Sequence, residues 1–200
     1  MSKLVNVLHV RASPRDEAHG SLSRKLGNAF FSKLNAEAAA KGTEVVTVIR
    51  DLTSFQLPHL TQEYAEKGFA FAPAMDISSE LSNELKAADI VVLETPVHNW
   101  APPAALKLWY DLTLTVGVAF EYTADGPRGM LGDKKFIVLQ ASGGTPVDAP
   151  NNFFSQHLDF LVGSVCGGDI VANIGVTGKA AEDDFAAADK SFDDVLDKLL

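Results

Sequence analysis

Three serine hydroxyls at one expected helix start are the clearest candidates for chemistry in this chain. Ser13 follows the first apolar run, and Ser21 and Ser23 stand where a helical pattern begins. A helix N-terminus offers unpaired N–H groups and a partial positive charge, and hydroxyls add hydrogen bonds to a phosphate. The segment therefore favours a monophosphate site, which needs no lysine. The alternative is a serine N-cap in a solvated loop, because serine is a leading cap residue.

Familiar nucleotide motifs are missing from the same segment, 11–23. It has neither the GxGxxG of a dinucleotide-binding turn nor the GxxxxGK[ST] of a P-loop. A phosphate here would be bound by hydroxyls and helix amides instead.

A second segment, Thr95–Pro103, combines the rings of His98 and Trp100 with the amide of Asn99 and three prolines. Such a stiff wall with a few polar groups suits a flat heteroaromatic ring whose edge carries donors and acceptors. Structural roles are equally favoured alternatives to ligand binding. His98 would then be a structural histidine, and Trp100 would pack in the core or at a dimer interface.

A third segment, Gln140–Pro150, contains the pair Gly143-Gly144 shortly after an apolar run. Paired glycines after a buried strand allow a ligand to approach the backbone closely, and an ordinary tight turn would use them as well.

Two other kinds of site find little support. Ser142, Asp148 and His157 suggest a hydrolase triad, but the GxSxG elbow is absent and His157 falls inside an expected helix. The histidines show no HExxH or similar ligand spacing, which argues against a metal site.

Apolar runs and amphipathic stretches alternate along the whole chain, and they must position these segments. Strands are expected at Leu4–Val10, Val45–Ile49, Ile90–Glu94, Phe136–Gln140 and Ile170–Val176. Helices are expected at Ser21–Lys41, Ile77–Ala88, Pro103–Thr115, Asn152–Val165 and Lys179–Leu200, with Asp51–Pro73 as an irregular excursion that holds a short helix near Gln62–Lys67.

The continuous apolar character of these strands predicts an α/β fold, a parallel sheet with helices on both faces. Five strands favour the doubly wound, flavodoxin-like order 2-1-3-4-5. Residues 1–200 contain no linker or repeat and are expected to form a single domain. In such a sheet ligands bind beyond the carboxyl ends of the strands, where all three segments would lie.

Composition narrows the class of protein further. The chain has 200 residues and a formal net charge of −9, which makes nucleic acid and anionic membranes poor partners. No apolar run approaches the length of a membrane span, and the N-terminus does not resemble a signal peptide. Cys166 is the only cysteine, so no internal disulfide forms. A cytoplasmic protein is expected.

At its three loop segments the chain resembles the FMN-dependent NADH:azoreductases, flavodoxin-like NAD(P)H:quinone and azo-dye reductases. The resemblance covers essentially the whole chain. It is carried by Pro96–Trp100 with Leu106, Lys107 and Asp111, by Phe120–Gly129, and by Gly143-Gly144 with Asp148 and Pro150.

The resemblance implies an FMN site and assigns residues to it. The FMN phosphate would be held by Ser13, Ser21, Leu22 and Ser23. The ribityl chain and isoalloxazine would contact Val97, His98, Asn99 and Trp100, and the other side of the ring would be lined by Ala141, Ser142, Gly143 and Gly144. Tyr122 would be a pocket residue, and the flavin site would lie at the interface of a homodimer.

The resemblance further implies that the chain is an oxidoreductase with a ping-pong mechanism. A hydride would pass from NADH or NADPH to flavin N5, and a quinone or azo compound would then accept two electrons. The alternative is a non-catalytic FMN electron-transfer module, which the acidic balance of the chain favours. The apolar segments Phe69–Pro73 and Trp100–Pro103, expected as pocket and interface walls, argue for the enzyme.

Overall fold

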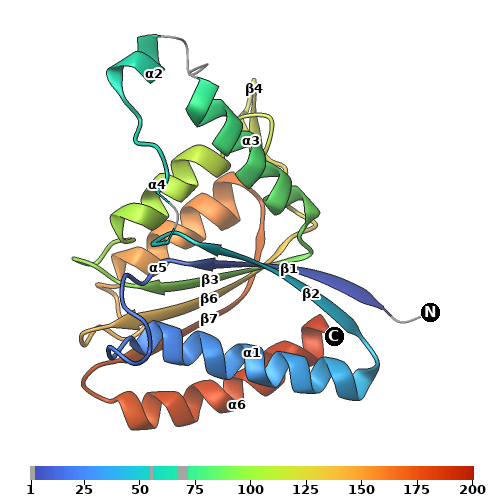
Figure 1. Cartoon of the computed structure of the whole chain (residues 1–200), viewed down its shortest axis with the longest axis vertical. Helices are drawn as coiled ribbons and strands as arrows, with labels where there is room; N and C mark the ends of the chain where they lie inside the picture. Colours follow the sequence, from blue (N-terminus) through green and yellow to red (C-terminus); the bar gives the residue numbers. More distant parts are fainter. Residues whose placement is uncertain (1–2, 55, 67–71) are drawn as a thin grey trace.

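The computed structural model describes residues 3–54, 56–66 and 72–200. Its main sheet contains five parallel strands in the order β2-β1-β3-β6-β7 (Figure 1). The strands are β1 (Leu4–Arg11), β2 (Glu44–Asp51), β3 (Ile90–Pro96), β6 (Lys135–Ser142) and β7 (Asp169–Thr177). Without the two hairpin strands described below, this is the predicted order 2-1-3-4-5, so the flavodoxin-like architecture is confirmed.

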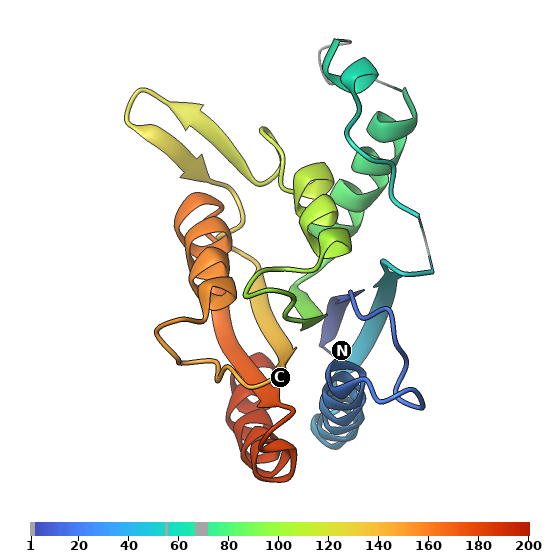
Figure 2. The same cartoon turned by 90° about the vertical axis from the view of Figure 1, so that its left-hand side faces the viewer.

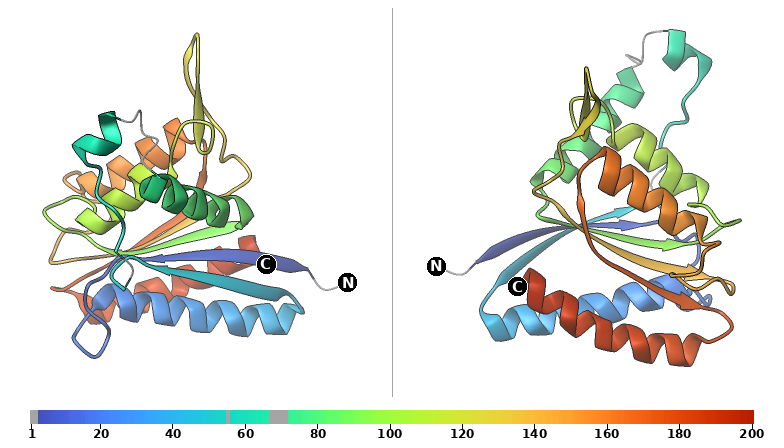
Figure 3. Two further views of the ribbon diagram at one scale, coloured as in Figure 1. Left: turned by 45° about the horizontal axis from the view of Figure 1, so that its top comes forward. Right: turned by 180° about the vertical axis from the view of Figure 1, so that it is seen from behind.

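Helices cover both faces of the sheet, as predicted (Figures 1 and 3). One face carries α1 (Leu22–Lys41) and α6 (Ala181–Leu199). The other face carries α3 (Ala72–Ala87), α4 (Ala104–Thr113) and α5 (Phe153–Leu158), which continues as a π-helical stretch, η1 (Asp159–Val165). The short helix α2 (Gln62–Glu66) lies in the excursion between β2 and α3, where a short helix was expected.

Each face of the sheet has its own apolar core. Under α1 and α6, Phe30 and Phe192 pack edge to face with their ring centroids 5.3 Å apart. On the other face Trp109 of α4 and Phe154 of α5 are fully buried. Strands β3 and β6 lie between the two cores, because their aliphatic side chains are buried on both faces.

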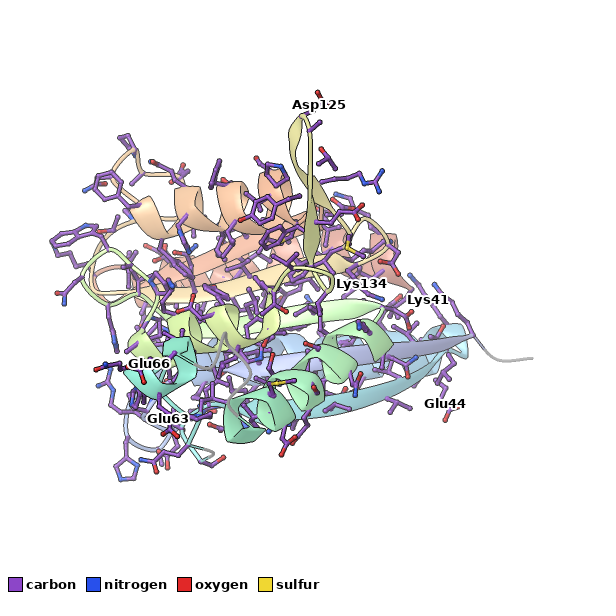
Figure 4. All side chains as sticks on the ribbon, turned by 90° about the horizontal axis from the view of Figure 1, so that it is seen from above. Lys41, Glu44, Glu63, Glu66, Asp125 and Lys134 are labelled. Atoms are coloured by element: carbon purple, nitrogen blue, oxygen red, sulfur yellow. The ribbon has the colours of Figure 1, made fainter. Side chains whose placement is uncertain are left out.

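Two features differ from the sequence-based expectations. A hairpin of β4 (Phe120–Thr123) and β5 (Gly126–Gly129) projects from the sheet (Figure 2), and Asp125 lies at its tip (Figure 4). Helix α3 begins at Ala72, whereas the sequence placed its start at Ile77. Pro73 is compatible with that early start because the first turn of a helix needs no N–H from its residues.

Candidate functional site

A cavity of about 250 Å³ opens at the carboxyl ends of β1, β3 and β6, where the three predicted segments meet. It brings together most of the predicted site residues, namely Ser13, Ser21, Leu22, Ser23, Val97, His98, Ala141, Ser142 and Gly143. Residues that are far apart in the sequence meet here because parallel strands end at the same edge of a sheet.

The three serine hydroxyls form one cluster. Ser13 Oγ lies 2.8 Å from Ser21 Oγ, which lies 3.2 Å from Ser23 Oγ, and all three residues are buried. Ser21 is also the N-cap of α1, and its hydroxyl accepts the N–H of Arg24. The first amides of α1, those of Leu22 and Ser23, have no intrahelical acceptor. The cluster and these amides together form a donor set for an anion.

The segment after β3 makes a tight turn at the mouth of the cavity. His98 and Ala101 exchange backbone hydrogen bonds of 3.0 Å, and Asn99 and Trp100 between them have positive φ angles of 51° and 60°. Positive φ at both central residues is typical of a type I′ turn and costs energy for non-glycine residues, most of all for a bulky one. Strain of this kind concentrates at ligand sites.

The segment after β6 is held in place by side-chain hydrogen bonds. Asn152, the N-cap of α5, donates to the carbonyl of Pro146 at 3.0 Å and to the amide oxygen of Gln140 at 3.1 Å. Ser142 Oγ donates to the carbonyl of Thr145 at 2.7 Å. A Cβ added at Gly143 would meet no atom within 4 Å, so this backbone faces open space.

Some predicted residues do not line the cavity of the single chain. Asn99 and Trp100 belong to the turn at its mouth, and Trp100 is 52% exposed. Gly144 packs against the side chain of Lys179 instead. Part of the expected wall at Phe69–Pro73, residues 69–71, lies outside the described residues.

Sequence reasoning did not assign five residues that line the cavity, Pro14, Arg15, Gly20, Pro96 and Gly178. Gly178 follows β7, and its N–H donates to the carbonyl of Ser142 at 2.9 Å. Its position directly after an apolar strand was the feature of the sequence that could have indicated a cavity residue.

The residues of the rejected hydrolase triad do not form one site. Ser142 lines the 250 Å³ cavity, whereas His157 lines a separate cavity of about 820 Å³ over α3 and α4.

Cys166 is buried, and burial raises the pKa of its thiol to about 11, so it stays protonated. Among the described residues, no cluster of three or more His, Cys, Asp and Glu side chains could hold a metal ion. In the same part of the chain no helix has the length and apolar character to span a membrane.

A buried histidine lies behind the serine cluster. His9 in β1 donates its Nε2–H to Glu94 Oε2 at 2.9 Å, and its ring stacks on Phe31 with the centroids 4.2 Å apart. Burial lowers the pKa of His9, although the hydrogen bond and the charge of Glu94 act in the opposite direction. His9 is therefore neutral in the folded protein at neutral pH.

This lowered pKa predicts a pH dependence of stability. Below about pH 6.5 the unfolded chain protonates His9 before the folded chain does, so the free energy of unfolding falls as the pH drops through that window. We expect His9→Asn to show a smaller loss of stability than the wild type between pH 7.5 and 5.5. Urea unfolding of both proteins at the two pH values measures the difference. The same pH dependence in both would contradict this assignment.

The sheet order, with a cavity at the carboxyl ends of β1, β3 and β6, defines a protein of flavodoxin-like architecture. The Flavodoxin_2 family model, described as a flavodoxin-like fold, matches residues 5–198. This chain belongs to that family.

Comparison with known proteins identifies relatives of similar length. An FMN-dependent NADH:quinone oxidoreductase of Erythrobacter litoralis is 33% identical over 200 residues, which cover 94% of this chain and 98% of the relative. A protein of the same name from Azotobacter vinelandii is 36% identical over 167 residues, which cover 78% of this chain and 81% of the relative. The crystal structure of an azoreductase from Bacillus anthracis aligns with a TM-score of 0.81 at 27% identity, over 97% of this chain and 99% of that one.

Proposed function

We propose that this chain is an FMN-dependent oxidoreductase that takes a hydride from NADH and passes two electrons to a quinone or azo compound. The observation that carries the proposal is the cavity in which three clustered hydroxyls at the start of α1 face the turn after β3 and the glycine segment after β6. The names of the relatives support the same cofactor, reductant and acceptor class.

The residues present fit FMN. Ser13, Ser21 and Ser23, with the first amides of α1, would hold the phosphate, because helix N-termini and hydroxyls suit a phosphate group. The segments Val97–Trp100 and Ala141–Gly144 would contact the ribityl chain and the ring. The open space beside Gly143 allows a flat group to lie close to the backbone.

When bound, FMN supplies the acceptor atom N5 for the hydride and stores two electrons between the half-reactions. The protein orients the reactants and stabilises charge. Backbone N–H groups near Asn99 and Gly143 would stabilise the negative charge of the reduced ring, as amides do in an oxyanion hole. Hydrogen bonds within 140–152 hold the amide of Gly143 in place, and the paired bonds between His98 and Ala101 hold that of Asn99.

His98 is the candidate proton donor to the acceptor, because it lines the cavity. His98→Phe removes the donor and keeps a ring of similar width. We expect kcat with a quinone to fall about a hundredfold or more, within the usual range for general acid catalysis, while the Kd of FMN changes little. Steady-state assays and a flavin titration measure the two quantities. Unchanged turnover would remove His98 from the mechanism.

The ping-pong order is tested by steady-state kinetics. One reactant must leave before the other enters if both use the same face of the site. Double-reciprocal plots against NADH at several quinone concentrations should then be parallel. Lines that intersect would instead show that both reactants bind together.

We also propose that the enzyme is a homodimer. Several large apolar side chains are exposed in the single chain, namely Trp100, Val116, Tyr122, Met130, Phe153 and Phe160. Exposed apolar patches mark interaction sites. Tyr122, on the projecting hairpin, is 73% exposed and does not line the cavity of its own chain. It would line the site of the partner subunit, which requires an interface at the flavin.

Light scattering after size exclusion tests the assembly. We expect the mass of two chains for the wild type and of one chain for a Tyr122→Asp, Phe160→Asp variant. A wild type with the mass of one chain would contradict the dimer.

A further inference from the structure

Arg24 connects the two sides of the serine cluster. Its backbone N–H donates to Ser21 Oγ at 3.2 Å, and its guanidinium Nη2 donates to the carbonyl of Ser13 at 2.9 Å. Ser13 lies in the segment after β1, whereas Ser21 caps α1. A single residue thus links the strand side and the helix side of the phosphate cradle, which we define as Ser13, Ser21 and Ser23.

The guanidinium of Arg24 is held from behind by two carboxylates. Nη2 also donates to Asp51 Oδ2 at 2.8 Å, at the end of β2, and Nη1 lies 3.4 Å from Glu94 Oε1 in β3. The Arg24 side chain is 5% exposed and that of Glu94 is fully buried. Buried charges persist only with partners, so the two acids fix where the guanidinium can sit.

Glu94 is itself fixed by the neighbouring strand. It lies beside Arg11 in the register of β1 and β3, and Arg11 Nε is 3.7 Å from its Oε2. The N–H of Ala12 donates to the backbone carbonyl of Glu94 at 2.9 Å. The support of Arg24 is therefore part of the sheet.

A phosphate site requires its donors to be held within about 0.5 Å of the binding geometry. The hydroxyls of the cradle rotate, so their spacing depends on the backbone that carries them. Arg24 fixes that backbone at Ser13 and, through the cap, at Ser21. Its Nη2 donates to two acceptors, and its Nη1 faces the Glu94 carboxylate as an ion pair, an arrangement that the point charge of lysine cannot reproduce.

We propose that Arg24, seated on Glu94 and Asp51, is the positioning residue of the phosphate cradle and gives this protein its preference for the phosphorylated flavin. The inference rests on the proposed FMN function. Arg24 acts through the serines, and its effect should be confined to the phosphate end of the ligand.

Riboflavin, which lacks the phosphate, separates this role from general damage to the site. For Arg24→Lys in the apo protein we expect the Kd of FMN to rise about tenfold or more, while the Kd of riboflavin changes less than about twofold. Asp51→Asn keeps an acceptor and removes the charge, and it should shift the ratio of the two Kd values in the same direction by a smaller factor. Quenching of flavin fluorescence measures the Kd of FMN and the Kd of riboflavin.

Arg50→Lys is the matched control. Arg50 is the arginine at the penultimate position of β2 and bonds two carboxylates, Glu80 and Glu84, away from the cradle. Its substitution should leave the ratio unchanged. Circular dichroism establishes whether each variant is folded, and Asp51→Asn decides the test if Arg24→Lys is not.

Four results would overturn the inference. Equal losses for FMN and riboflavin would show a merely structural role, and unchanged Kd values for both ligands in folded Arg24→Lys and Asp51→Asn would show no role. A wild type that binds FMN and riboflavin equally would reject the cradle but leave a flavoprotein. A wild type that binds neither would remove the proposed function and the inference together.

Discussion

Replacing Ser13 and Ser23 together by alanine should weaken FMN binding about a hundredfold or more. Hydrogen bonds to a charged group contribute about 1.5–3 kcal/mol each, and 1.4 kcal/mol corresponds to a factor of ten. Both hydroxyls belong to the buried cluster at the start of α1. Ser21 is left in place because it caps the helix and its loss would also lower stability. Fluorescence titration of the apo protein gives the Kd.

Two comparisons make this result specific. Riboflavin binding should hardly change in the double variant, because in the proposed site the substituted hydroxyls would contact only the phosphate. Ser191→Ala, which removes an exposed hydroxyl bonded within α6, should leave both ligands unaffected. If the double variant binds FMN as tightly as the wild type, the phosphate lies elsewhere.

Glu94→Ala should lower the free energy of unfolding by about 3–5 kcal/mol, the usual cost of breaking a buried ion pair from one side. Glu94 is fully buried and faces Arg24 and Arg11, so its removal leaves both guanidinium groups without this partner. Urea unfolding of the apo protein measures the loss. Glu121→Ala, which breaks an exposed pair with Arg128, should cost less than about 1 kcal/mol. Similar losses for both variants would contradict a special role for Glu94.

Gly27 offers a second measurement on the same carboxylate. In a helix such as α1, Gly→Ala ordinarily stabilises by about 1 kcal/mol. A Cβ at Gly27 would lie 2.1 Å from Glu94 Oε2, whose position is fixed by its partners. We therefore expect Gly27→Ala to destabilise the wild type and to stabilise Glu94→Ala. The same sign in both backgrounds would show that the two residues are not coupled.

Much of the fold was predictable because its strands are continuous runs of aliphatic residues. The run Ile90–Glu94 identified a strand buried on both faces, and Gly42 identified the end of α1, where it takes the left-handed conformation. The hairpin Phe120–Gly129 was missed because its strands are short and interrupted by Pro127. The pair Asp125-Gly126 was the available signal, since Asp-Gly is typical of hairpin turns.

The candidate site was predictable in its loops but not in its support. Ser13, His98 and Gly143 follow strands, and the rule for parallel sheets brings such residues together. The link between Arg24 and Glu94 joins residues 70 positions apart, and nothing local marks either as a partner. Glu94 ends a run that is otherwise aliphatic, so an acid there is the one sign of a buried charge.

The proposed function requires that this chain bind FMN and that NADH reduce the bound flavin. The purified protein is loaded with FMN, desalted, and titrated with NADH without oxygen while the visible spectrum is recorded. We predict that the flavin absorbance is retained after desalting and bleaches with one equivalent of NADH. Retained flavin that NADH fails to bleach would indicate an electron-transfer module that needs a separate reductase. Loss of all flavin on desalting would contradict the site built from Ser13, Ser21 and Ser23.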